Sequence, residues 1–211
     1  MLNDKGFDLW ADGYDRDVGI SDEDDTYPFA GYKEVLGRIF RILAEKPDAA
    51  VLDLGFGTGT LTAKLYEKGC RVYGQDFSER MIGIAREKMP GAVLARGDLA
   101  QGLAGILKER TYDFILSTYA LHHLTDSEKS SLIRECLGLL APGGRILIGD
   151  VAFRTREDLD RCRAEAGEDW DDSEIYIVYE ELRDEFPAMT FERISRCAGL
   201  LSLSRSRETE I

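Results

Sequence analysis

The residues with the clearest chemical meaning lie in the segment Asp53-Leu54-Gly55-Phe56-Gly57-Thr58-Gly59, which continues a short apolar run. An open α/β sheet binds nucleotide-like ligands where a strand passes through such a glycine loop into a helix, because glycines let the backbone approach the ligand. The spacing differs from the dinucleotide fingerprint GxGxxG, since Thr60 stands where the third glycine would be. Asp53 would also disfavour a pyrophosphate. The loop therefore favours a nucleotide-like ligand other than a dinucleotide, although the glycines could also serve only a tight turn.

Two further acids follow the next two apolar runs of the chain. Asp76 ends the run VYGQD, and Asp98 ends the run ARGD. If these runs are parallel strands, both carboxylates lie at the same sheet edge as the glycine loop, where they can accept hydrogen bonds from hydroxyl or amino groups of a ligand. Asp76 could instead cap the helix that follows, but Ser78 is already placed to do so, and Asp98 could be an ordinary loop acid.

The hydrophobic pattern predicts the elements that bring these residues together. From residue 49 onward, short apolar runs alternate with longer amphipathic stretches, which is typical of a parallel sheet with helices on both faces. Strands are expected at 49–55, 70–76, 92–98, 112–118 and 145–151. Helices are expected at 5–17, 28–44, 58–68, 78–88, 100–109, 125–140, 155–166 and 175–185, with a turn at 141–144. The last two strands, in TFERISR and LLSLSR, would form an antiparallel hairpin.

The predicted fold class is α/β, with a doubly wound, mostly parallel seven-stranded sheet and an antiparallel C-terminal hairpin. The pattern D-x-G-x-G-x-G resembles the first motif of class I S-adenosylmethionine-dependent methyltransferases, and further segments agree with that family in order. These segments are VYGQDFS, ARGDLA, STYALHHL, LLAPGGRILIGD and the opening FDLWADGYD. The resemblance covers about residues 7–151 and the terminal hairpin, and points to small, single-domain, bacterial-type small-molecule methyltransferases with a Rossmann-like fold.

The resemblance also implies a division of the single domain 1–211 into four parts. Residues 1–45 would form an N-terminal helical cap and residues 46–151 the cofactor-binding core. Residues 152–189 would form an acidic helical segment, and residues 190–211 the hairpin.

S-adenosylmethionine is the cofactor that the resemblance implies. In the family, an acid at the end of the second strand binds the ribose hydroxyls and an acid after the third strand binds the adenine amino group, and Asp76 and Asp98 match these positions. The chemistry agrees, because the cofactor is a cationic sulfonium without phosphate, next to which carboxylates are favourable. Phe56, Phe77 and Leu99 are expected chiefly to pack. The expected cofactor contacts are Asp53, Gly55, Phe56, Gly57, Gly59, Asp76, Phe77, Met81, Asp98, Leu99, Ser117 and His122.

The sequence leaves the catalytic residue unassigned, with His123, Tyr14 and Tyr119 as candidates. His122 and His123 are the only histidines, and adjacent imidazoles at the end of a strand could include a general base. The ALHHL run occurs in family members of unlike specificity, however, which favours a structural role with one ring near the cofactor. Further candidates for substrate contact are Tyr32, Asp150 and Trp170.

The charge of the chain excludes several kinds of partner. With 27 basic and 40 acidic residues the formal net charge is −13, and no basic patch is present, so neither nucleic acid nor an anionic membrane is expected as a partner. Residues 1–30 hold nine acids and two bases, and residues 165–185 hold ten acids and one base. Because the fold brings both segments near the substrate side, we expect a neutral or cationic methyl acceptor. The acidic loop 168–174 is expected to be a solvated flap, in a position from which it could hang over the substrate.

The cysteines indicate a reducing compartment. Cys70, Cys136, Cys162 and Cys197 are scattered, with no CxxC pair and no cluster of histidines nearby, so neither a disulfide framework nor a metal site is expected. The opening residues do not resemble a signal peptide, and no apolar run approaches the ~20 residues of a membrane span. We therefore expect a cytoplasmic protein, either a monomer or a homodimer.

The leading hypothesis is an enzyme that moves a methyl group from S-adenosylmethionine to an O, N, S or C atom of a small molecule by in-line displacement. Ser117-Thr118-Tyr119-Ala120 differs from the Asn/Asp-Pro-Pro-aromatic tetrapeptide of enzymes that methylate exocyclic adenine amines or glutamine amides, which argues against that branch. One alternative is a catalytically idle methyltransferase-like regulatory or binding subunit. Another is an NAD-linked oxidoreductase. The acceptor and its reacting atom are left open.

Overall fold

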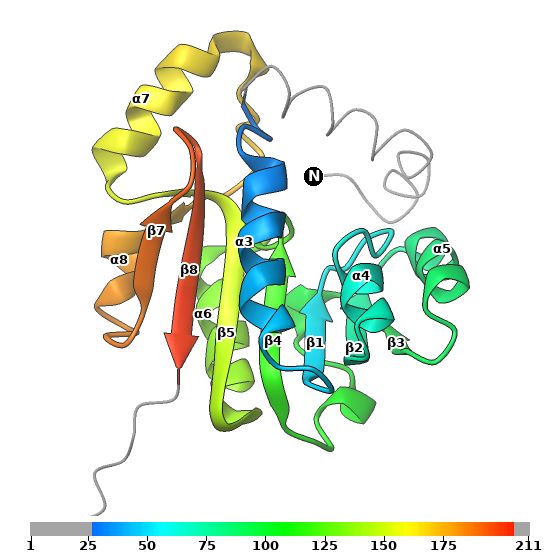
Figure 1. Ribbon diagram of the computed structural model, residues 1–211. Coiled ribbons are helices and arrows are strands. Elements are labelled where there is room, and N and C mark those ends of the chain that lie inside the picture. The colour runs from blue at the N-terminus through cyan, green and yellow to red at the C-terminus, as the bar shows by residue number, and fades with distance from the viewer. Residues whose placement is uncertain (1–26, 205–211) are drawn as a thin grey trace, which may run out of the picture.

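The computed structural model describes residues 27–204, which form one sheet with helices on both faces (Figure 1). Within these residues the sheet has eight strands, and its main path runs β3-β2-β1-β4-β5-β8-β7. Strands β1 to β5 pair in parallel, whereas β8 is antiparallel to β5 and β7. The predicted fold class is therefore confirmed, although the described residues form eight strands and not the expected seven, because β6 pairs with β5 off the main path. The strands are β1 Ala50–Leu54, β2 Arg71–Asp76, β3 Val93–Arg96, β4 Tyr112–Thr118, β5 Leu140–Phe153, β6 Ile177–Val178, β7 Thr190–Arg193 and β8 Ala198–Ser204.

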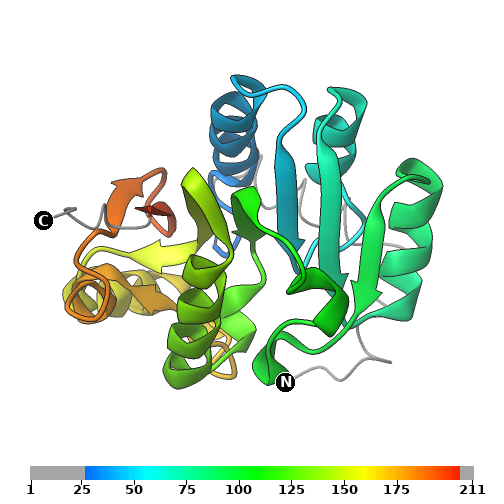
Figure 2. The same ribbon diagram turned by 90° about the horizontal axis from the view of Figure 1, so that it is seen from below.

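Burial on both faces explains why the central strands read as continuous apolar runs. All five residues of β1 are buried, and successive side chains alternate between two core layers. Val51 lies in the layer under α3, α4, α5 and α7, whereas Leu52 lies in the layer under α6. Figure 2 shows α3 and α6 on opposite faces of the sheet. The α-helices are α3 Tyr32–Ala44, α4 Thr62–Glu67, α5 Glu79–Lys88, α6 Asp126–Gly138, α7 Arg156–Ala166 and α8 Tyr179–Arg183.

The two ends of the chain carry predictions that the structure does not address. The helix expected at 5–17, with Tyr14, lies outside the described residues, as do residues 205–211. The helix expected at 28–44 is present but begins at Tyr32. The C-terminal hairpin is confirmed, because β7 and β8 pair antiparallel. None of the helices in residues 27–204 is long and apolar enough to cross a bilayer.

The prediction of a helix at 100–109 is wrong. The chain forms two short 3-10 helices instead, η1 Leu99–Gln101 and η2 Gly105–Leu107, with Gly102 between them at a φ of 83°. The Gln75 side chain of β2 accepts a hydrogen bond of 2.7 Å from the Ala104 N–H and donates one of 2.9 Å to the Gly102 carbonyl. These bonds occupy backbone groups that a continuous helix would pair internally.

Three other boundaries are shifted by the backbone around them. The helix expected at 58–68 begins at Thr62, because the glycine loop continues in left-handed conformations up to Gly59. Strand β5 is longer than the expected 145–151, and its pairing with β4 skips residues 141–144, so the expected turn is a bulge within the strand. The helix expected at 175–185 is wrong at its start, because Ile177–Val178 pairs with the end of β5 and only α8 is helical.

The predicted cap at Ser78 is confirmed, and of Thr125 and Asp126, the two residues that the sequence offers as cap of the next helix, Thr125 is the cap. The Ser78 hydroxyl accepts a 3.2 Å hydrogen bond from the Met81 N–H at the start of α5. At the start of α6, the Glu128 N–H donates to the Thr125 hydroxyl and the Thr125 N–H donates to the Glu128 carboxylate, which completes a capping box. The helix that this second cap begins directly follows the loop that carries both histidines.

We expect Thr125→Ala to lower the free energy of unfolding by about 0.5–2 kcal/mol, because the variant loses the side-chain acceptor of the capping box. Urea unfolding at constant pH measures the change. Ser131→Ala is the matched control, because the exposed Ser131 hydroxyl only donates back to the Ser127 carbonyl within the same helix. Equal losses in the two variants would show that the capping box does not stabilise this loop.

Candidate functional site

The candidate site lies at the carboxyl edge of the parallel strands. The structure pairs Asp53 of β1 with Gly74 of β2 and Leu116 of β4, so the ends of these strands lie side by side. The segments that follow them are the glycine loop, the Asp76-Phe77-Ser78 turn and the stretch from Tyr119 to His123. Most of the sequence-predicted site residues are therefore brought to one edge.

The three glycines of the loop have different roles. Gly55 has a φ of 74°, and a Cβ added there would lie 2.4 Å from the Ala120 Cβ, so only glycine permits this approach between the loops after β1 and β4. A Cβ at Gly59 would lie 3.0 Å from the Met89 methyl group. A Cβ at Gly57 would meet no atom of the described residues within 4 Å. Gly57 therefore borders open space, as a backbone that approaches a ligand must.

Asp76 links the glycine loop to helix α5. Its Oδ2 accepts a 2.9 Å hydrogen bond from the Gly57 N–H, and its Oδ1 accepts one of 2.9 Å from the Ser78 N–H. The side chain is 6% exposed. These two bonds hold the glycine loop against the turn before α5. Ser78 caps α5, so Asp76 is not the residue that caps this helix.

Asp53 is a buried carboxyl group whose two oxygens differ in hydrogen bonding. The Thr62 hydroxyl donates to its Oδ2, whereas its Oδ1 is buried and has no hydrogen-bond partner among the described residues. Burial raises the pKa of Asp53 to about 7, and the nearby Asp76 carboxylate adds to this increase. A cationic or hydrogen-donating ligand group at Oδ1 would relieve this cost.

The remaining expected cofactor contacts differ in exposure. Asp98 is exposed and caps η1 by accepting a 2.9 Å hydrogen bond from the Ala100 N–H. Phe56 is buried in the core, where it packs so closely on Gly74 that a Cβ there would lie 2.5 Å from its ring. The Ser117 hydroxyl donates a 2.8 Å hydrogen bond to the Leu54 carbonyl, so it ties β4 to β1. Phe77 and Leu99 are half-buried, and Met81 is buried in the first turn of α5.

Tyr119 holds an unusual backbone conformation at the end of β4. Its φ is 50°, in the left-handed region that a bulky residue rarely adopts. Its N–H donates a 2.9 Å hydrogen bond to the Gly149 carbonyl, and its ring lies against those of Phe29 and Tyr32, with centroid distances of 5.5 and 4.9 Å. Such strain is stored mainly at functional sites, which supports Tyr119 and Tyr32 as parts of the site.

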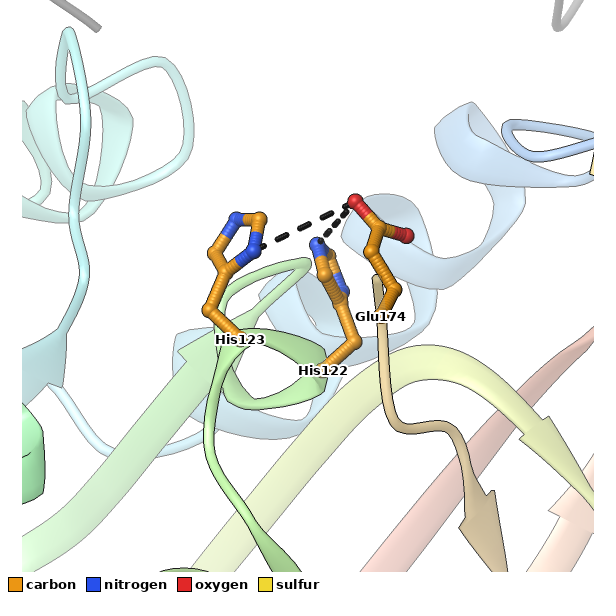
Figure 3. Close-up of side chains that lie close together, drawn as sticks. All are labelled: His122, His123 and Glu174. Atoms are coloured by element: carbon orange, nitrogen blue, oxygen red, sulfur yellow. Dashed lines mark ion pairs between the residues drawn. The ribbon is translucent and has the colours of Figure 1, made fainter. Parts of the chain in front are cut away.

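His122 is a buried imidazole between two carboxylates. Its Nδ1 lies 2.6 Å from Asp150 Oδ1. Its Nε2 lies 3.5 Å from Glu174 Oε1, the contact that a dashed line marks in Figure 3. Burial lowers the pKa of His122, but the charge and hydrogen bond of Asp150 and the charge of Glu174 outweigh burial, so the pKa lies above its ordinary value. The Asp150 carboxylate is fully buried and also accepts hydrogen bonds from the Leu121 and Val151 N–H groups.

His123 lies beside His122 in a different electrostatic state. The two ring centroids are 4.1 Å apart, and the His123 side chain is 31% exposed. Burial, followed by the charge of His122, lowers the pKa of His123 to about 4. His123 is therefore neutral at pH 7, so one of its ring nitrogens carries a lone pair.

Sequence reasoning missed an aromatic cluster that covers the histidines. Trp170 stacks on Tyr27 with a centroid distance of 4.9 Å, and Tyr176 contacts both rings edge-on. The Tyr27 and Tyr176 hydroxyls are hydrogen-bonded to each other, and Tyr176 also donates to Glu174 Oε2 at 2.6 Å. The loop that was expected to be a solvated flap thus turns Trp170 and Glu174 inward, and no local sequence signal distinguishes Glu174 from the acids around it.

Comparisons with known proteins agree with this geometry. Residues 51–144 match the family described as a methyltransferase domain. The chain is 43% identical over 163 residues to an uncharacterized methyltransferase of Geobacillus sp. (strain WCH70), an alignment that covers 77% of this chain and 73% of that protein.

Two solved structures share the fold at lower identity. The magnesium protoporphyrin IX methyltransferase of Synechocystis PCC 6803, with bound SAH, is 23% identical with a TM-score of 0.66, and the match covers 84% of this chain and 85% of that one. An N-methyltransferase of Bradyrhizobium japonicum WM9, in complex with S-adenosyl-l-homocysteine, is 20% identical with a TM-score of 0.63, and the match covers 87% and 90% of the chains.

The raised pKa of Asp53 predicts a characteristic pH dependence of stability. Because the folded chain binds the Asp53 proton more tightly than the unfolded chain, the stability from this group is lost as the pH rises from about 4 toward 7. We expect Asp53→Asn, which cannot ionise, to gain roughly 2–3 kcal/mol relative to wild type between pH 5 and pH 8. Urea unfolding at both pH values measures the difference.

Asp160→Asn is the control for this experiment, because Asp160 is an exposed acid on α7. Its stability relative to wild type should be the same at both pH values. A stability difference between Asp53→Asn and wild type that does not change with pH would contradict the raised pKa.

Proposed function

Because this chain belongs to the class I S-adenosylmethionine-dependent methyltransferases, we propose that it transfers a methyl group from that cofactor to a small molecule that is neutral or cationic. The observation that carries the proposal is the pair of buried carboxylates, Asp53 and Asp76, beside the open space at Gly57. A phosphate-bearing ligand would be repelled there, whereas a cationic one is attracted.

The described residues fit the cofactor in three respects. Asp53 Oδ1 is a buried acceptor without a partner among them, and it suits the positively charged end of the cofactor. Asp76 would accept hydrogen bonds from the ribose hydroxyls while it holds the Gly57 N–H. Asp98, which caps η1, and Leu99, its first residue, would meet the adenine, and Phe77 and Met81 would supply further cofactor contacts.

The chain's own residues would act mainly by positioning. The cofactor supplies a methyl group on a cationic sulfonium. The loops after β1 and β4, locked together at Gly55 and Ala120, would hold cofactor and acceptor in one fixed relation. Such alignment is worth as much as ~7–11 kcal/mol of a bimolecular barrier. In-line displacement by an acceptor already rich in electrons would then need no strong base.

For an acceptor that must lose a proton, His123 and Tyr119 are the candidates among the described residues. His123 is neutral at pH 7, because its pKa is lowered to about 4 by burial and by His122, so it can accept a hydrogen bond from the acceptor. Tyr119 lies in the loop after β4 that also carries His123, and its backbone there is left-handed, with a φ of 50°. Tyr14, the third candidate, lies outside the described residues.

Calorimetry with S-adenosylhomocysteine tests the cofactor site. We expect saturable binding to wild type, and a loss of affinity of about 10- to 100-fold in Asp76→Asn, since a hydrogen bond to a charged group contributes ~1.5–3 kcal/mol. Asp160→Asn, on the exposed face of α7, should bind as wild type does. No binding to wild type, or equal affinity in wild type and Asp76→Asn, would contradict the assignment.

Incubation of the protein with methyl-labelled cofactor and a fractionated metabolite pool tests the acceptor class. The label is expected in a neutral or cationic small molecule, because the acids at this edge disfavour an anion. Label in a phosphorylated product, in protein or in nucleic acid would contradict the proposed acceptor. Intact cofactor binding without transfer to any fraction would instead indicate the idle regulatory subunit.

A further inference from the structure

The only two histidines of the chain meet a glutamate at the carboxyl edge of the sheet. Glu174 Oε1 lies 3.5 Å from His122 Nε2 and 4.0 Å from His123 Nδ1. One ligand atom from each of the three residues lies within 4.8 Å of the others. Figure 3 shows the two rings, which come from η3 (Leu121–His123), turned toward the carboxylate, which comes from the segment before β6.

A second set of contacts orients these three side chains. The buried Asp150 carboxylate lies 2.6 Å from His122 Nδ1 and fixes the ring so that Nε2 faces Glu174. Binding of a metal ion at Nε2 would release the proton from that nitrogen. The Tyr176 hydroxyl donates to Glu174 Oε2 at 2.6 Å, which leaves Oε1 on the side of the histidines. The Ile175 N–H donates a 2.8 Å hydrogen bond to the His122 carbonyl and holds the two segments together.

We propose that His122 Nε2, His123 Nδ1 and Glu174 Oε1 bind a divalent transition-metal ion of the zinc type. Four ligands placed tetrahedrally at the usual Zn–N and Zn–O distances lie about 3.3–3.4 Å from one another. The observed distance of 3.5 Å needs a contraction of about 0.1–0.2 Å and that of 4.0 Å a contraction of about 0.6–0.7 Å, and the atoms of the two histidines must approach from within 4.8 Å. Imidazole and carboxylate ligands suit Zn²⁺, and three protein ligands leave a position for water or substrate.

An ordinary ion pair accounts for less of this arrangement. His122 already has a carboxylate partner in Asp150, so it does not require Glu174 as a second one. An ion pair also gives no reason for His123 Nδ1 to lie beside the same oxygen. Asp150 contacts the His122 ring, and the Tyr176 hydroxyl contacts the Glu174 carboxylate. Protein metal sites commonly orient their ligands through outer contacts of this kind.

The four cysteines do not contribute to this site. All four are buried and free of disulfides, and none belongs to the cluster. The expectation from the sequence that no metal site exists rested on the absence of a local cluster. Glu174 is distant from the histidines in the sequence, and only the return of the chain along β6 brings it to them.

The ion would lie at the carboxyl edge of the sheet, where we propose that the methyl acceptor binds. This consequence rests on the proposed function. An oxygen or nitrogen atom of the acceptor could occupy the remaining coordination position. The positive charge of the ion would balance the carboxylates of Asp150 and Glu174 there. Metal binding itself requires neither the cofactor nor methyl transfer, so it can be measured alone.

The test uses the full chain, purified without a polyhistidine tag and stripped of metal with a chelator. Titration with Co²⁺ is expected to give one saturable site with visible d–d absorption and no sulfur-to-cobalt charge-transfer band, because the ligands are nitrogen and oxygen. Added Zn²⁺ should displace the cobalt. Absence of these bands in protein that melts cooperatively would overturn the proposal, as would a charge-transfer band from a cysteine.

Two variants identify the ligands. Glu174→Gln should weaken Co²⁺ binding by at least about 100-fold, because removal of even an outer-shell partner commonly costs 10- to 100-fold. Glu168→Gln is the matched control in the same acidic segment and should bind as wild type does. Equal Co²⁺ affinity in Glu174→Gln and wild type would overturn the proposal. His123→Asn gives a second measurement, with the same expected loss, if Glu174→Gln does not fold.

Calorimetry with S-adenosylhomocysteine on the metal-free protein separates this proposal from the proposed function. Cofactor binding without cobalt binding would overturn the metal site alone. Cobalt binding without cofactor binding would support the metal site and contradict the proposed cofactor site.

Discussion

The close approach of Gly55 to Ala120 is the contact on which the candidate site depends. A side chain at position 55 would lie 2.4 Å from the Ala120 Cβ, so the loops after β1 and β4 touch only because one residue has no side chain. The contact places the glycine loop on one side and the residues from Tyr119 to His123 on the other. The two sets of residues are thereby held at a fixed separation, as the proposed alignment of cofactor and acceptor would require.

Three buried carboxylates at this edge differ in how far the protein satisfies them. Asp76 accepts two backbone N–H groups, and Asp150 accepts two backbone N–H groups and the His122 ring. Asp53 receives only the Thr62 hydroxyl on one oxygen, and its pKa is raised to about 7 by burial. Since an unsatisfied buried acceptor is costly, Asp53 is the position at which a ligand adds most. The oxygen of Asp53 that has no partner among the described residues therefore lowers the stability of the folded chain and also offers a ligand an acceptor.

The sequence predicted those parts of the fold that depend on local pattern. Buried runs such as that of β1, the glycine loop and the cap at Ser78 are encoded by neighbouring residues. The helix at 100–109 failed because Gln75, a distant side chain, takes up the backbone groups of Gly102 and Ala104. The strand at 177–178 was missed because its partner is the end of β5.

The candidate site likewise contains some residues that the local sequence pattern predicts and others that it does not. Asp53, Asp76 and the glycines could be proposed because they stand at or directly after the carboxyl end of a recognisable strand. Glu174 could not, because it stands in a run of acids that looks solvated, and its inward direction depends on Tyr176 and on the backbone bond to His122. Side chains held by contacts between distant segments leave no local pattern to read.

The distribution of ion pairs limits what the net charge of −13 says about the acceptor. Several acids of the 165–185 segment are paired with arginines: Glu181 with Arg156 at 2.5 Å, Asp172 with Arg163 at 2.5 Å and Glu185 with Arg134 at 2.6 Å. These exposed pairs are screened by solvent and give little field at the site. Glu174 is different, because it is largely buried and faces the histidines. A preference for a neutral or cationic acceptor therefore depends on a few carboxylates at the edge and on any cation that His122, His123 and Glu174 bind, rather than on the total charge of the chain.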